Sequence, residues 1–190
     1  MIIKVVRASD PSCVLARLPA GASRLSAFIS DNINCGDPDD APVAEHVMAL
    51  EDKQSFGFEF VAEYLIRHAD DEGAPFKYSI EGVEYDAGGE LVGRWPELLD
   101  VTDEAEKERI LSECAWIDAM SPRQLLQTLN CADFLSVDGL LNLASAGMAR
   151  RIMPKTPDAM EAWFIKNLPA DIKPPAFKPP IAVIGEGEGR

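Results

Sequence analysis

Three helix-start signals in the C-terminal third of the sequence constrain the fold most. Ser121-Pro122-Arg123-Gln124 combines an N-cap serine, a proline at the first helical position and a glutamine at N3, which is the pattern of a capping box. Asp138 is placed to cap a second helix, and Thr156-Pro157-Asp158 to begin a third, short one. Short helices need packing partners, so this segment must be covered by the rest of the protein or by another one.

Apolar residues recur at helical intervals in this segment. Core packing accounts for each of them taken singly, whereas a partner-binding surface accounts better for the segment as a whole. We expect three apolar faces: Leu125, Leu129 and Ala132 in the first helix; Leu141, Ala144, Met148 and Ile152 in the second; and Met160, Trp163 and Phe164 in the third.

The N-terminal part mixes strand and helix patterns. IIKVVR at 2–7 and VLARL at 14–18 predict the strands of a hairpin, and ASRLSAFISDNI at 22–33 predicts one short helix. VAEHVMALE at 43–51 favours a third strand, although its composition also permits a helix. Phe56, Phe60 and Tyr64 are spaced four residues apart, which predicts a helix with one buried face that ends in the acidic run near residue 73.

The middle of the chain and its end differ in character. Residues 76–95 alternate apolar and polar positions around an Ala-Gly-Gly turn, which predicts either a small hairpin or a loop that becomes ordered on binding. DEAEKERILSECAWI at 103–117 returns to a helical pattern. After Asn167 the chain is rich in proline, which favours extended polyproline-like backbone and therefore a docking arm or linker.

These patterns predict an α+β fold, because strands and helices do not alternate as in a nucleotide-binding sheet. We divide the sequence into an N-terminal part (1–73), an insertion or linker (74–102) and further helices of the same domain (103–137). A pair of binding helices (138–168) and an extended tail (169–190) follow.

Composition narrows the class of partner. The net charge of −14 over 190 residues disfavours nucleic acid and anionic membranes as partners, because their phosphates repel such a surface. No apolar run approaches the ~18 residues of a membrane span, and the charged N-terminus is too short for a secretory signal. Four cysteines without metal-ligand spacing indicate reduced thiols, so we expect the cytoplasm or the nucleus; the cysteines are Cys13, Cys35, Cys114 and Cys131.

The sequence carries no recognisable catalytic pattern. It lacks the motifs of serine hydrolases, zinc peptidases, P-loop proteins and dinucleotide-binding proteins. The two histidines, His46 in a strand-like run and His68 at a helix end, are typical of structural or capping residues. We predict no catalytic, cofactor-binding or metal-binding residue, and a binding protein rather than an enzyme.

Residues 131–167 resemble the Skp-one family of adaptors. The similarity rests on Ala132, Leu135 and Gly139-Leu140-Leu141, then on Ile152, Lys155-Thr156-Pro157-Asp158, Phe164 and Ile165-Lys166-Asn167. The opening strand IIKVVRASD, the acidic DPDDAPV segment and FEFVAEYLIRHADDEG are similar to the family's N-terminal half. Together these two blocks, one before and one after the insertion, cover about 120 residues in total.

The resemblance implies a BTB/POZ fold with added C-terminal helices and an adaptor that bridges an F-box protein to a cullin in a ubiquitin ligase. It implies that Phe134 contacts the cullin, with Asp133-Phe134 standing where the family has Asn-Tyr. It also implies a set of F-box contacts: Gly139, Leu140, Leu141, Lys155, Thr156, Pro157, Phe164, Ile165 and Asn167.

Other functions remain open on the sequence alone. The insertion and the proline-rich tail, which replaces the family's acidic last helix, are compatible with a diverged structural subunit held permanently in a larger complex. BTB folds often self-associate, so the N-terminal helices can support a homodimer. An enzyme using His46 or Cys131 ranks last.

Overall fold

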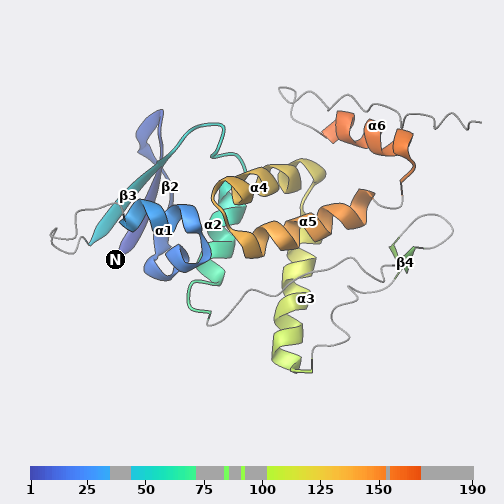
Figure 1. The fold of residues 1–190 in the computed structure, drawn as a ribbon, viewed down its shortest axis with the longest axis horizontal. Coiled ribbons are helices and arrows are strands. Elements are labelled where there is room, and N and C mark those ends of the chain that lie inside the picture. The colour runs from blue at the N-terminus through green and yellow to red at the C-terminus, as the bar shows by residue number, and fades with distance from the viewer. Residues whose placement is uncertain (35–43, 72–83, 86–90, 93–101, 153–154, 168–190) are drawn as a thin grey trace, which may run out of the picture. The chain divides into compact units, whose positions relative to one another are not determined.

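A computed structural model describes residues 1–34, 44–71, 84–85, 91–92, 102–152 and 155–167. They form a three-stranded sheet, a two-stranded ladder and several helices, so the predicted α+β class is confirmed (Figure 1). The chain divides into two compact units, Met1–Pro154 and Lys155–Arg190.

The three-stranded sheet is built around β1 (Ile2–Arg7). This strand pairs antiparallel with β2 (Asp10–Pro19) and parallel with β3 (Glu45–Leu50), in the order β2-β1-β3. The predicted hairpin and third strand are therefore confirmed. Val5 lies opposite Ala16 on one side and Met48 on the other, and its side chain is fully buried.

The connection from β2 to β3 begins with two short helices, η1 (Ala20–Leu25) and α1 (Ala27–Asn34). The single helix predicted at 22–33 is wrong, because Ser26 between them has extended backbone. The buried Ser26 hydroxyl donates to the carbonyl oxygen of Leu135 and accepts from the backbone N–H of Ile29 at 3.1 Å. Ser26 therefore caps α1 and ties it to the turn after α4.

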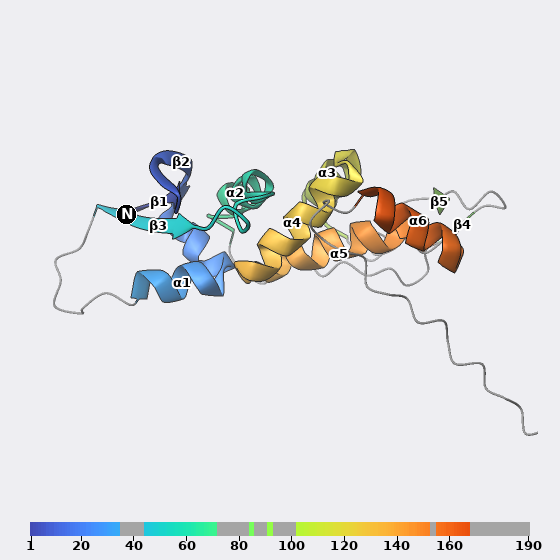
Figure 2. The ribbon, with the colours of Figure 1, turned by 90° about the horizontal axis from the view of Figure 1, so that it is seen from above.

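Helix α2 (Phe58–Arg67) lies between the sheet and the later helices (Figure 2). Its apolar face, which includes Phe58, Val61 and Leu65, is buried in the core. Gly57 precedes the helix with φ of +81°, where the backbone comes close to α4. His68 forms the C-cap, as expected for a histidine at a helix end.

Helices α3 (Glu104–Ala119), α4 (Pro122–Phe134) and α5 (Asp138–Ile152) complete the first unit. Asp103 caps α3, and the capping box predicted at Ser121–Gln124 is confirmed by both of its hydrogen bonds. Helices α4 and α5 lie side by side in both views (Figures 1 and 2). Arg151 of α5 donates to the carbonyl oxygen of Ile117 at 2.8 Å and so covers the C-terminal end of α3.

The apolar face predicted for α5 is confirmed in part, because Ala144 and Met148 are buried. Asp138 is the first residue of the helix and not its cap, and the buried face is centred on Leu140, Leu143 and Gly147. Leu141 and Ile152 are only partly buried. A Cβ atom at Gly147 would lie 2.4 Å from Cγ2 of Ile117, so the absence of a side chain lets α3 and α5 approach closely. The spacing of apolar residues cannot predict that a glycine such as Gly147 lies on the buried face.

The insertion and the end of the chain are described only in part. β4 (Glu84–Tyr85) and β5 (Leu91–Val92) pair antiparallel, in agreement with the hairpin predicted there. The second unit contains α6 (Pro157–Asn167). The remainder of the insertion, and the tail predicted at 169–190, lie outside the described residues.

Candidate protein-interaction surface

Helix α6 carries most of the residues that the sequence predicts to contact an F-box protein. The Thr156 hydroxyl accepts from the backbone N–H of Ala159 at 3.3 Å and Pro157 is the first helical residue, so these two residues start the helix as predicted. Near the other end, the Asn167 side-chain amide donates to the carbonyl oxygen of Trp163 at 2.7 Å. Lys155 precedes the helix and is partly exposed.

None of the residues of α6 is buried, although the helix carries large apolar side chains. Trp163 and Phe164 pack edge to face with ring centroids 5.2 Å apart, and both remain partly exposed. The side chain of Ile165 is 57% exposed. The spacing pattern predicts Trp163 on the apolar face of this helix, and the resemblance does not include it among the F-box contacts, although its ring adjoins that of Phe164.

The start of α5 holds the other three predicted contacts. Leu140 is fully buried and Gly139 is buried with it, so both belong to the core of the first unit. Leu141 is partly exposed and is the member of this trio whose side chain reaches the surface. The backbone N–H of Leu141 donates to the carbonyl oxygen of Val137 at 2.9 Å, which fixes the first turn of the helix.

Phe134, the predicted cullin contact, belongs to an aromatic pair. Its ring packs against that of Phe28 in α1, with centroids 4.9 Å apart and an interplanar angle of 48°. Both rings are partly exposed, and Asp133 beside them is exposed. Phe28 lies more than a hundred residues earlier in the chain, so no local pattern links it to Phe134.

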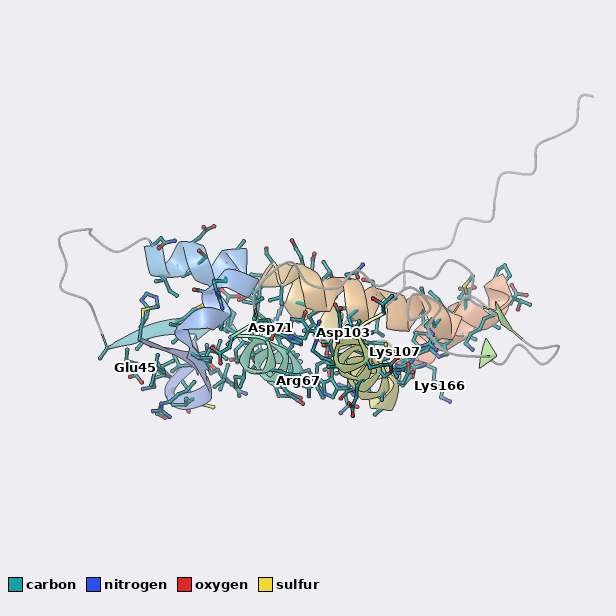
Figure 3. All side chains as sticks on the ribbon, turned by 90° about the horizontal axis from the view of Figure 1, so that it is seen from below. Glu45, Arg67, Asp71, Asp103, Lys107 and Lys166 are labelled. Atoms are coloured by element: carbon teal, nitrogen blue, oxygen red, sulfur yellow. The ribbon has the colours of Figure 1, made fainter. Side chains whose placement is uncertain are left out.

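A polar cluster joins the end of α2 to α3 across the insertion (Figure 3). His68 Nδ1 lies 2.6 Å from Asp71 Oδ2, and Nη1 of Arg109 lies 3.3 Å from both Asp71 and Glu113. Tyr64 packs on the imidazole, and burial, together with the charge of Glu113, raises the pKa of the Tyr64 phenol. The phenol therefore stays protonated, and the cluster acts as a structural link between two helices.

The described residues offer little for nucleophilic or metal chemistry. Burial raises the pKa of the Cys131 thiol to about 12, so the thiolate needed for nucleophilic attack is scarce at neutral pH. Cys13 and Cys131 carry thiols. Within the described ranges, no group of histidine, cysteine and carboxylate side chains is arranged to hold a metal ion. Among the helices described here, none combines the length and apolar character of a membrane span.

Comparison with known proteins adds no relative: no protein-family model matches this chain, and no curated protein is significantly similar to it.

Proposed function

We propose that this protein is an adaptor of the Skp-one type, with a BTB/POZ fold, that binds F-box proteins through α6 and the exposed part of α5. The sequence resemblance at residues 131–167 suggests the partner class. The observation that carries the proposal is α6, a helix of 11 residues that has no buried side chain among those described.

An isolated helix of this length is marginal in water, so partner contact would stabilise it. Burying one isoleucine side chain contributes about 1.5–3 kcal/mol, and tryptophan is among the residues that dominate binding energy at interfaces. Ile165 and Trp163 supply these anchors on a single helix. The aromatic pair Phe28–Phe134 is the proposed cullin contact, because both rings are partly exposed and Phe134 holds the position that the resemblance indicates.

Replacing Ile165 with aspartate is expected to lower the recovery of F-box proteins with the tagged protein at least tenfold. The reason is that a carboxylate placed in an apolar interface loses its hydration without gaining a partner. The measurement is quantitative mass spectrometry of proteins retained by the tagged chain from cells of the source organism.

The matched control is Val47→Asp, because Val47 of β3 is 56% exposed and Ile165 is 57% exposed. The two variants have the same net charge, and neither removes a buried side chain. Recovery of F-box proteins should be unchanged by Val47→Asp. Undiminished recovery with Ile165→Asp, or an equal loss with both variants, would rule out α6 as the binding helix.

A further inference from the structure

A second surface of the first unit forms an apolar groove between α2 and β2. The groove has a volume of about 500 Å³. Leu15 and Ala16 of β2 form one wall, and Ala62 and Ile66 of α2 form the other. Ile66 is 51% exposed, so more than half of its apolar side chain is open to a partner.

One wall of the groove is an edge strand. β2 pairs with β1 on one side, and the described residues place no strand on its other side. The ladder shifts between Val5 and Val6 of β1, so Leu15 of β2 falls outside the paired register. A free strand edge offers backbone N–H and C=O groups to an extended segment, whereas a helical partner would leave these groups unpaired.

The rim of the groove is acidic. Arg67, which is labelled in Figure 3, is already paired within the rim. Its guanidinium lies 2.6 Å from Glu63 and 5.1 Å from the centre of the Trp116 ring. Glu63 also accepts from Trp116 Nε1 at 3.3 Å, which holds these three side chains together. Glu59 is exposed, and no described cation forms an ion pair with it. A basic side chain on the occupant would supply that missing charge.

We propose that this groove binds an extended segment of a partner protein in which apolar residues alternate with lysine or arginine. Alternate side chains of an extended segment point to opposite sides. The apolar ones would pack on Ala62 and Ile66, and the basic ones would face Glu59 and solvent. The groove shares no residue with α6 or with the Phe28–Phe134 pair, so it adds a binding site to the proposed adaptor function.

The test uses three fluorescein-labelled decapeptides and the full chain, with affinity measured by fluorescence anisotropy. In the first peptide valine alternates with lysine, in the second serine alternates with lysine, and in the third valine alternates with glutamate. We expect the first to bind at least tenfold more tightly than either of the others. The serine peptide controls for non-specific attraction of lysine to a chain of net charge −14.

Two variants of the protein locate the binding. Ile66→Asp is expected to weaken binding of the valine–lysine peptide at least tenfold, although its added negative charge would strengthen a purely electrostatic attraction. Val47→Asp adds the same charge elsewhere on the surface and should leave the affinity unchanged. Circular dichroism should show both variants folded, because both side chains are more than half exposed.

Three results would overturn the proposal: equal affinity for the valine–lysine and serine–lysine peptides, unchanged affinity for Ile66→Asp, or no binding of the first peptide. Binding that is detected only after residues 169–190 are deleted would also overturn it, since the groove would then serve the chain's own tail. None of these results bears on the recovery of F-box proteins through Ile165.

Discussion

Replacing Gly57 with alanine is expected to lower the free energy of unfolding by about 2–5 kcal/mol. Gly57 has φ of +81°, a backbone conformation that a residue with a Cβ atom adopts at a cost. The added Cβ would also lie 2.5 Å from the carbonyl carbon of Gln127 and 2.7 Å from the backbone nitrogen of Thr128. Because these are backbone atoms of α4, no side-chain rotation can relieve the contact. Urea unfolding followed by circular dichroism measures the effect.

Gly147→Ala provides the comparison. Its Cβ would meet Cγ2 of Ile117 at 2.4 Å, which is a side-chain atom and can move, and its φ is not positive. We expect a smaller loss of about 1–3 kcal/mol, typical of overpacking. A Gly57→Ala variant as stable as the wild type, or less affected than Gly147→Ala, would contradict the close approach of α2 and α4 that the structure shows.

Two neighbouring leucines on α5 are expected to separate stability from binding. Leu140→Ala should lower the free energy of unfolding by about 2–5 kcal/mol, because Leu140 is fully buried and its truncation leaves a cavity. Leu141→Asp should cost less, about 1–2 kcal/mol, because part of the Leu141 side chain is already in contact with water. It should nevertheless abolish binding of F-box proteins.

Unfolding curves and affinity purification on the same two variants check this separation. The proposed role of Leu141 fails if Leu141→Asp binds F-box proteins like the wild type. It also fails if Leu141→Asp is as unstable as Leu140→Ala, because the leucine would then be a core residue with no separate role in binding.

Local signals in the sequence predicted where α3, α4, α5 and α6 begin. The capping box at Ser121–Gln124 and the start at Thr156–Pro157 are confirmed, because cap hydrogen bonds form between residues two or three positions apart. The hairpin of β1 and β2 follows from strand patterns on either side of a turn. Ser26 escaped prediction, because its extended backbone depends on the carbonyl of Leu135, 109 residues later.

Contacts between distant segments account for the other differences. The parallel pairing of β3 with β1 joins strands separated by two short helices, which strand composition cannot indicate. The buried face of α5 depends on the close approach of Ile117 to Gly147. The polar cluster combines local and long-range contacts. Asp71 lies three residues from His68, whereas Glu113 and Arg109 come from another helix.

The candidate site could also be predicted only in part. The resemblance pointed to α6 and to the start of α5. It could not tell that Leu140 is fully buried while Leu141 is partly exposed, since the two leucines differ by one helical position. Phe28 belongs to the candidate site because the fold brings its ring into contact with that of Phe134. The groove beside Ile66 likewise requires the packing of α2 against β2.

The central claim is that the protein bridges F-box proteins to a cullin, and affinity purification of the unmodified chain tests it most directly. Mass spectrometry of the retained proteins is expected to identify a cullin together with several different F-box proteins. A single partner set in fixed stoichiometry, without a cullin, would contradict the adaptor function and indicate a permanent structural subunit of a larger complex.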